Sequence, residues 1–320
     1  MNYIDVFNGD ADGLCALQQI RLDNPQESLL ITGPKRDISL LKRVTASAGD
    51  QITVLDISLD KNRDALMALL ESGVGVRYFD HHFAGEVPKH ALLETHIDTS
   101  PQICTSLLVN QYLQERFCAW AVTGAFGDNF HAQARQAAQP LSLAPVQLDA
   151  LCELGTLLNY NGYGEGDEIF FRPEELFRKL HPYADPFAFI AEEKAFLILR
   201  EGYRNDMAMM ADVQPELSEE HIAVYILPDV PWARRASGVF ANDLVGRHPS
   251  RAHAILTRLP GGGFQVSVRA PQNNLTGADA LCRAFATGGG RKAAAGINQL
   301  PESALGQFID AFRNTYCGYT

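Results

Sequence analysis

Residues 76–83 read Val-Arg-Tyr-Phe-Asp-His-His-Phe, so that a mostly apolar run stops abruptly at one carboxylate and two imidazoles. The stretch 84–88 that follows, Ala-Gly-Glu-Val-Pro, is typical of a loop. Such a run suits a buried strand of a parallel sheet, and the ligands of open α/β sheets collect at the carboxyl ends of their strands. The triplet Asp80-His81-His82 therefore predicts a metal site or an acid–base site in an α/β protein. Taken alone, the triplet equally fits a strand end whose polar side chains merely meet solvent.

Two earlier strands are expected to end in the same way. An apolar strand over 3–7 leads into Asn-Gly-Asp-Ala-Asp-Gly, which places Asp10 and Asp12 two positions apart at a strand-to-helix turn. Two like charges held close need a cation between them, although an aspartate that caps a helix after a turn would also explain the pattern. A third strand, over 52–55, ends in Asp56. Because carboxylates with imidazoles suit Mn²⁺ or Mg²⁺, and imidazoles favour Mn²⁺, these strand ends together predict a divalent-metal site.

The remaining pattern predicts an α/β chain of two parts. The pattern predicts strands that alternate with helices at the start of the chain, as in a parallel sheet, and mostly helix over residues 130–200. We expect a parallel-sheet domain over 1–200 with a helical extension, a linker over 201–221 and a smaller α/β domain over 222–320, with a cleft between the two domains. Further strands are predicted over 29–32, 222–227, 252–256 and 264–268, and helices over 14–22, 38–45, 61–72, 104–113, 119–126, 146–158, 187–199, 238–245, 277–285 and 302–314.

Composition narrows the class of protein. Of the 320 residues 46% are hydrophobic and 20% are charged, as in globular chains, and the net charge of −11 argues against a broad basic surface for long nucleic acid. A short polyanion bound in a local positive pocket stays compatible with this charge. The six cysteines are scattered, no apolar run reaches the ~20 residues of a membrane span, and no signal peptide precedes the first strand. We therefore expect a cytoplasmic protein with no membrane partner.

The acidic and imidazole residues resemble, in order and approximate spacing, the motif set of the DHH phosphoesterase family. The residues that carry this resemblance are Asp10, Asp12, Asp56, Asp80, His81, His82 and Asp128. Asp128 follows a glycine and would ordinarily be a turn residue; it is a candidate ligand because it stands where the family places one. Residues 267–270 (Ser-Val-Arg-Ala) and the glycine-rich stretch 288–296 resemble the companion substrate-binding domain, called DHHA1. The family includes RecJ-type exonucleases, oligoribonucleases, cyclic-dinucleotide phosphodiesterases and related inorganic pyrophosphatases.

The resemblance implies a pair of divalent ions, Mn²⁺ with Mg²⁺ as the alternative. Their ligands would be Asp10 for one ion, Asp12, His81 and Asp128 for the other, and Asp56 between the two. His82 would contact the scissile phosphate or the leaving oxygen, and Asp80 would orient the imidazoles, as carboxylates beside metal ligands commonly do. Two divalent ions ~3.5–4 Å apart lower the pKa of a bound water and neutralise the charge that develops on phosphorus.

The resemblance also implies a phosphate-binding set in the C-terminal domain, facing the metal site. This set comprises Arg269, Gly288, Gly289, Gly290 and Arg291; glycine-rich backbone can present N–H groups to an anion, and arginine binds phosphate bidentately. Three positions depart from the family pattern. Val6 stands where many relatives have a histidine ligand, and Asn8 stands where RecJ-type sequences carry an aspartate and could ligate only through its neutral carbonyl. Arg291 replaces a histidine and cannot shuttle a proton at neutral pH.

These features favour a Mn²⁺-dependent phosphoesterase that hydrolyses phosphodiester or phosphomonoester bonds of short nucleotides, such as short oligonucleotides, cyclic dinucleotides or nucleoside bisphosphates. One alternative is a hydrolase of pyrophosphate or polyphosphate. The other is a nucleotide-binding regulator with a weakened catalytic centre, which the replacements at Val6 and Arg291 would explain. Tyr160 and Tyr163, in a glycine-rich stretch, could stack a nucleobase or belong to an ordinary connector. The sequence leaves a homodimer open.

Overall fold

The computed structural model describes residues 1–164 and 166–318, without the side chain of residue 167; the last two residues of the predicted second domain lie outside the description. The chain divides into two compact units, Met1–Glu201 and Gly202–Thr320. The boundary falls within helix α9 (Lys194–Met210), so that residues 201–210 of the expected linker are helical. Within the described ranges, no helix combines the length and the apolar character needed to cross a membrane.

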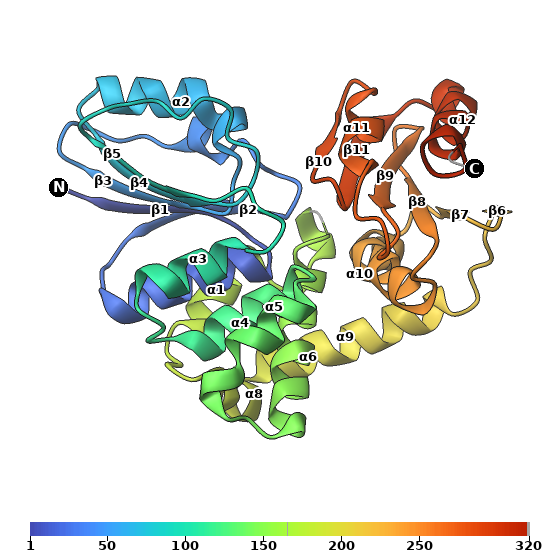
Figure 1. Ribbon diagram of the computed structural model, residues 1–320. Helices are drawn as coiled ribbons and strands as arrows, with labels where there is room; N and C mark the ends of the chain where they lie inside the picture. The colour runs from blue at the N-terminus through green and yellow to red at the C-terminus, as the bar shows by residue number, and fades with distance from the viewer. Residues whose placement is uncertain (165, 319–320) are drawn as a thin grey trace. The chain divides into compact units, whose positions relative to one another are not determined.

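The first unit contains a parallel sheet of five strands in the order β2-β1-β3-β4-β5, as expected from the alternating pattern (Figure 1). The strands are β1 (Tyr3–Asn8), β2 (Leu29–Gly33), β3 (Gln51–Leu55), β4 (Gly75–Asp80) and β5 (Leu93–Ile97). In register, Phe7 pairs with Leu55 and Leu55 pairs with Phe79, so the carboxyl ends of β1, β3 and β4 lie side by side. The edge strand β5 was not predicted, because its sequence Leu-Glu-Thr-His-Ile is half-exposed and has no apolar run.

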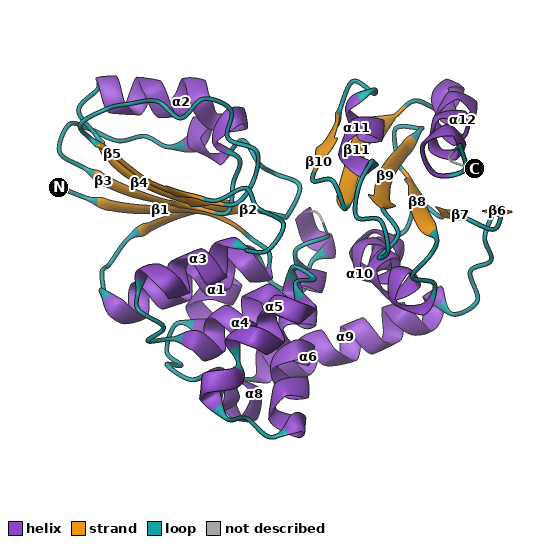
Figure 2. Ribbon diagram, viewed as in Figure 1, coloured by secondary structure: helices purple, strands orange, loops and turns teal. Residues whose placement is uncertain are grey.

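Helices cover both faces of this sheet (Figure 2). On one face lie α2 (Leu59–Glu71) and the 3₁₀ turn η1 (Leu40–Arg43); on the other lie α1 (Ala11–Asp23) and α3 (Thr105–Tyr112). The prediction of a helix over 38–45 is wrong, since only the 3₁₀ turn η1 forms there. Its backbone groups are satisfied by a side chain instead, since Leu41 N donates to Asn62 Oδ1 (3.2 Å) and Asn62 Nδ2 donates to the carbonyl of Ile38 (2.7 Å).

Helices dominate the rest of the first unit, as predicted for the extension. They are α4 (Cys118–Gly127), α5 (His131–Ala137), η2 (Gln139–Leu141), α6 (Pro145–Asn161), η3 (Gly166–Glu168), α7 (Pro173–Leu180), α8 (Pro186–Glu192) and α9. The single helix expected over 187–199 is two helices, because Glu193 is extended and its carboxylate accepts a hydrogen bond from Ala195 N (3.2 Å) at the start of α9.

The second unit contains a mixed sheet of six strands in the order β10-β11-β9-β8-β7-β6. The elements are β6 (Leu217–Ser218), β7 (Ile222–Leu227), α10 (Pro231–Arg247), β8 (Ala252–Arg258), β9 (Phe264–Arg269), α11 (Ala278–Arg283), β10 (Gly288–Gly290), β11 (Ala294–Leu300), η4 (Glu302–Ala304) and α12 (Leu305–Tyr316). Phe308 of α12 and Leu281 of α11 share a buried core with Val266 and Ile297 of the sheet. The smaller α/β unit expected from the sequence is therefore present.

A buried ion pair ties β1 to α1. Arg21 Nε donates to Asp5 Oδ2 (2.7 Å), a second guanidinium nitrogen contacts Asp5 Oδ1, and Ser28 Oγ donates to Oδ2 (2.5 Å). Because Asp5 is fully buried, we expect Arg21→Met to lower the free energy of unfolding by about 3–5 kcal/mol, the cost of leaving a buried charge unpaired. Urea-induced unfolding followed by circular dichroism measures this loss.

The matched control is Arg116→Met, which removes the exposed partner of Asp23. Exposed ion pairs contribute about 0–1 kcal/mol, so this variant should unfold close to the wild type. Equal losses in the two variants would show that the Asp5–Arg21 pair is no more important than a surface pair.

Candidate metal centre

The carboxyl edge of the first sheet is where the strand order places a ligand site. From β1 the chain adds β2 on one side and β3 on the other, giving the doubly wound order 2-1-3-4-5. Ligands of such sheets bind outside the carboxyl ends of the strands, where the direction of strand addition reverses. The segments after β1, β3 and β4 carry Asp10 and Asp12, Asp56, and His81 and His82, respectively.

The turn after β1 is built around Asp10. Its Oδ1 accepts hydrogen bonds from the backbone N–H groups of Asp12 and Gly13 (both 3.1 Å), so Asp10 caps α1, as the capping interpretation proposed. The turn is tight, and a Cβ at Gly13 would lie 2.2 Å from the carbonyl oxygen of Asn8. Whether Asp10 also ligates a metal stays a prediction.

Asp12 is fully buried between α1 and α3. Its two carboxylate oxygens accept hydrogen bonds from the backbone N–H groups of Thr105 (2.7 Å) and Ser106 (2.8 Å), at the N-terminus of α3. The positive end of a helix thus holds this carboxylate in one orientation.

Asp56 follows β3 with a positive φ of 61°. This conformation is uncommon outside glycine, asparagine and aspartate, and it turns the carboxylate toward the cluster. The Thr105 hydroxyl donates to Asp56 Oδ1 (2.9 Å), so one residue of α3 binds both Asp12 and Asp56. Sequence reasoning did not identify Thr105, because only the folded chain brings α3 to these strand ends.

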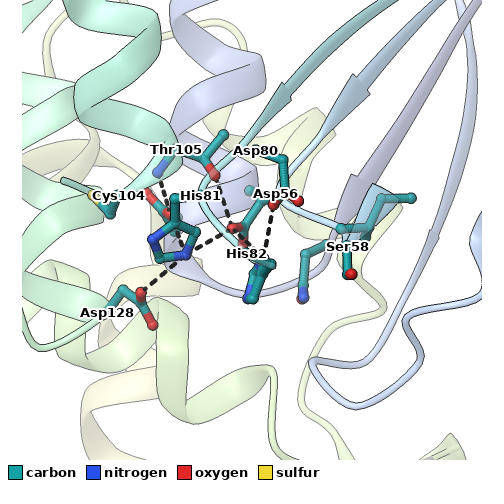
Figure 3. A network of polar contacts seen from close by, with 12 residues as sticks. Asp56, Ser58, Asp80, His81, His82, Cys104, Thr105 and Asp128 are labelled. Carbon is teal, nitrogen blue, oxygen red and sulfur yellow. Dashed lines mark hydrogen bonds and ion pairs between the residues drawn. The ribbon is translucent and has the colours of Figure 1, made fainter. Parts of the chain in front are cut away.

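His81 lies at the centre of the cluster (Figure 3). Its Nδ1 is 3.0 Å from the carbonyl oxygen of Ile103; since a carbonyl only accepts, Nδ1 carries the proton and Nε2 presents its lone pair. Nε2 lies 3.9 Å from Asp12 Oδ2, 3.5 Å from Asp56 Oδ1 and 3.6 Å from Asp128 Oδ2. This is the tautomer and orientation of a metal-ligating histidine.

His82 and Asp80 form a pair beside the cluster. Asp80 is fully buried at the end of β4, and its Oδ1 lies 2.7 Å from His82 Nδ1. The side chain of His82 is 29% exposed, whereas that of His81 is 2% exposed. His82 Nδ1 is also 3.9 Å from Asp56 Oδ1, so the pair is close to the metal candidates.

Among the residues that the structure describes, two sets of side chains bring their ligand atoms within 4.8 Å of one another: Asp56, His81 and His82; and Asp12, His81 and Asp128. A neutral imidazole among carboxylates is a donor set that fits Mn²⁺, and with more oxygen ligands Mg²⁺. The residues present therefore fit a divalent ion, and the structure gathers four of the five predicted metal ligands around one point. Asp10 belongs to neither set.

Lys35 is another residue of the centre that sequence reasoning missed. Its ammonium contacts Asp10 Oδ2, Asp128 Oδ1 (3.2 Å) and Asn159 Oδ1 (2.9 Å). A signal was present, because Pro34 and Lys35 directly follow β2, whose carboxyl end adjoins that of β1.

The buried carboxylates of the centre repel one another, and this repulsion shifts their pKa values. Burial raises the pKa of Asp56 well above its usual range, and the neighbouring charges of Asp12, Asp10 and Asp128 raise it further. Burial also raises the pKa of Asp12, with added repulsion from Asp128 and Asp10. For Lys35 burial acts to lower the pKa, but the charges of Asp10 and Asp128 outweigh it and raise the pKa above its usual value.

Four other positions that the sequence analysis named lie around the centre and contact the protein itself. Val6 packs in the apolar core between the sheet and α2. The side chain of Asn8 binds backbone: its Oδ1 accepts from Asp10 N (3.3 Å) and its Nδ2 donates to the Lys35 carbonyl (3.3 Å). Tyr160 is fully buried and cannot stack an incoming base, and the largely buried ring of Tyr163 lies 5.6 Å from Lys35 Nζ.

In the second unit, the predicted phosphate-binding residues lie at one end of neighbouring strands. Arg269 ends β9 opposite Ala294, and its Nε donates to Asn242 Oδ1 (2.7 Å). Arg291 begins the loop that joins β10 to β11, with its backbone N–H bonded to the Ala294 carbonyl (2.8 Å). The three glycines form an edge strand, β10, where a Cβ at Gly288 would lie 1.7 Å from the carbonyl oxygen of Cys282. Phosphate binding by these residues stays a prediction.

Neither a protein-family model nor a curated protein sequence matches this chain. Solved structures do. An exonuclease RecJ bound to manganese is 19% identical, with a TM-score of 0.58 over 97% of this chain and 88% of its own. RecJ from Thermus thermophilus in complex with Mn²⁺ is 18% identical, with a TM-score of 0.64 over 97% of this chain, which spans about half (51%) of that protein.

A pGpG-specific phosphodiesterase from Vibrio cholerae is 12% identical, with a TM-score of 0.53 over 98% of this chain and 97% of its own. At such identities the likeness shows the fold. RecJ-type exonucleases belong to the family that the sequence motifs resemble, and the matches span both units of the chain. The chain thus has the two-domain fold of the DHH superfamily, and it carries the Asp-His-His motif at the end of β4.

Proposed function

We propose that the chain is a Mn²⁺-dependent phosphoesterase that hydrolyses phosphodiester or phosphomonoester bonds of short nucleotides. The observation that carries this proposal is the convergence of Asp12, Asp56, His81 and Asp128, which come from separate segments, around one point at the carboxyl edge of the sheet. Manganese in both similar RecJ structures supports the choice of metal. A hydrolase of this kind is expected to work in the cytoplasm.

Four residues would hold the metal, namely Asp12, Asp56, His81 and Asp128. A bound divalent ion lowers the pKa of water and neutralises charge that develops on a phosphoryl group. The Ile103 carbonyl orients the His81 ring so that its Nε2 lies among the carboxylates that would hold the ion, and the N-terminus of α3 keeps Asp12 in place.

His82 is suited to proton transfer. The buried carboxylate of Asp80 lies 2.7 Å from Nδ1 and orients the ring, so that Nε2, when protonated, would donate a proton to the leaving oxygen. Asp80 Oδ2 is buried and has no hydrogen-bond partner among the described residues, and its Oδ1 contacts His82 Nδ1. Asp80 is thus a positioning residue, and His82 is the proposed acid.

Substrate size follows from charge and from the second unit. The net charge of −11 disfavours long nucleic acid. In the second unit, two arginines at one end of β9 and β10–β11, Arg269 and Arg291, would bind a phosphate group together with backbone at Gly288, Gly289 and Gly290. The phosphodiesterase from Vibrio cholerae, which is pGpG-specific, supports a dinucleotide as the first substrate to test.

The activity test uses the purified chain with Mn²⁺ and, in parallel, pGpG, pApA, a five-residue RNA, phosphoadenosine phosphate, cyclic dinucleotides and pyrophosphate. We expect turnover of the short linear nucleotides. His82→Ala should lower kcat by about 10²–10⁴-fold, the usual contribution of a general acid, while Mn²⁺ binding measured by calorimetry persists. His81→Ala should abolish both activity and Mn²⁺ binding.

The matched control is His90→Ala, at a half-buried position whose ring only accepts a hydrogen bond from Leu92 N (3.2 Å) and lies outside the centre. Its activity should equal that of the wild type. Pyrophosphate cleavage far faster than that of any dinucleotide would instead assign a phosphoanhydride hydrolase. Tight nucleotide binding without turnover at saturating Mn²⁺ would assign a regulator, and wild-type activity of His81→Ala would refute the metal centre.

A stability measurement tests the charge conflict without substrate. Since the buried, repelled Asp56 carboxylate has a raised pKa, its ionised form destabilises the folded metal-free chain. Asparagine tolerates the φ of 61°, so Asp56→Asn should raise the free energy of unfolding in EDTA at pH 7.5 by about 0.5–2 kcal/mol. Urea-induced unfolding measures this gain. With Mn²⁺ at about 100 times its Kd, the wild type should become more stable than Asp56→Asn, because binding raises the wild type's free energy of unfolding by about 2.7 kcal/mol.

The pH dependence has a defined sign. The wild-type carboxyl group takes up a proton on folding, so its destabilising effect develops as the pH rises through the raised pKa and disappears toward the ordinary value of 3.8. The gain of Asp56→Asn should therefore shrink between pH 7.5 and pH 5. Asp64→Asn, at an exposed position of α2, serves as the control and should stay within about 0.5 kcal/mol. A variant less stable than the wild type in EDTA at pH 7.5 would contradict the argument.

A further inference from the structure

Asp10 is already fully engaged by the protein itself. Its Oδ1 accepts the backbone N–H groups of Asp12 and Gly13, each at 3.1 Å, and its Oδ2 contacts the ammonium of Lys35. Among the described residues, both sets of side chains that could hold a metal contain His81, and neither contains Asp10. The carboxylate expected to hold one ion of a pair therefore binds a cation that the chain supplies.

Lys35 occupies a built ammonium site. A lysine ammonium has three N–H donors, and three oxygens receive them: Asp10 Oδ2, Asp128 Oδ1 at 3.2 Å and Asn159 Oδ1 at 2.9 Å. The side chain is only 20% exposed, and the ring of Tyr163 lies 5.6 Å from Nζ. A flexible surface lysine would not be surrounded in this way.

The backbone of Lys35 is held as firmly as its side chain. Its N–H donates to the carbonyl of Gly162 (2.8 Å), and its carbonyl accepts from Asn8 Nδ2 (3.3 Å). Asn8 Oδ1 in turn accepts from Asp10 N (3.3 Å), so one side chain joins the loop after β1 to the loop after β2. These contacts hold the ammonium against Asp10 and Asp128.

Few side-chain atoms near Asp10 are available to bind a second divalent ion. Val6 ends in methyl groups packed in the apolar core and offers no donor atom. Asn8 uses both its amide nitrogen and its oxygen on backbone groups. A second divalent ion would have to compete with Lys35 for Asp10, Asp128 and Asn159.

We propose that the ammonium of Lys35 takes the place of one of two divalent cations, so that the chain binds a single divalent ion. This inference rests on the proposed function. The ion would be held by Asp12, Asp56, His81 and Asp128, and Lys35 would supply the second positive charge beside it. Because the three N–H donors of its ammonium are taken by protein oxygens, Lys35 would act on the substrate through its positive charge alone, and it cannot activate water as a metal does.

The test is the number of Mn²⁺ ions bound per chain. The purified chain is dialysed against excess Mn²⁺, and bound metal is measured by elemental analysis and by electron paramagnetic resonance. We expect one Mn²⁺ per wild-type chain, with the spectrum of an isolated ion. Lys35→Ala leaves the oxygens of Asp10, Asp128 and Asn159 without their cation and should bind two Mn²⁺ with an exchange-coupled spectrum. Carboxylate and amide oxygens are suitable ligands for this second ion.

Lys61→Ala, an exposed position on α2, is the matched control and should bind one Mn²⁺ like the wild type. Lys35→Gln keeps a polar side chain of similar size and replaces Lys35→Ala if that variant does not fold; it should also bind two ions. Two ions per wild-type chain, or one ion in the folded Lys35 variants, would overturn the single-ion inference while leaving the phosphoesterase proposal intact. No Mn²⁺ bound to the wild type would overturn both.

Discussion

Repulsion among buried carboxylates at one sheet edge is the constraint on which the first unit depends. Asp10, Asp12, Asp56 and Asp128 all lie within the reach of His81 or Lys35, and each is at most 7% exposed. A set of like charges this far from water is unfavourable unless positive charge or N–H dipoles face it. The protein supplies part of that compensation through two helix N-termini and one lysine, and a divalent ion would supply the rest.

The compensation is shared between rigid elements. The N-terminus of α3 binds Asp12 and, through Thr105, also Asp56; the N-terminus of α1 binds Asp10. Each contact fixes a carboxylate before any ligand arrives, which is how a site is preorganised. The same contacts leave the metal-free centre electrostatically strained, because they orient the charges without neutralising them. Charge repulsion that lowers the stability of the ligand-free protein is expected at a functional site.

Sequence patterns predicted most of the fold, and the errors have local causes. The apolar runs of β1, β3 and β4 are buried strands, as expected from their composition. The missed strand β5 is a half-exposed edge strand without an apolar run. The helix expected over 38–45 does not form, because backbone groups of this segment bind the side chain of Asn62, which lies on another helix. In each case a partner distant along the chain outweighed local preference.

The sequence by itself determined that acidic and imidazole side chains would meet at one edge, since parallel strands align their carboxyl ends and each of three strands ends in such a residue. It also indicated the family whose fold the chain has. Only the tertiary structure decided that Lys35 lies between Asp10 and Asp128, that Asn8 serves backbone groups, and that Thr105 joins two carboxylates. Those contacts join residues far apart along the chain and depend on how loops and helices pack. No local periodicity or residue spacing in the sequence predicts them.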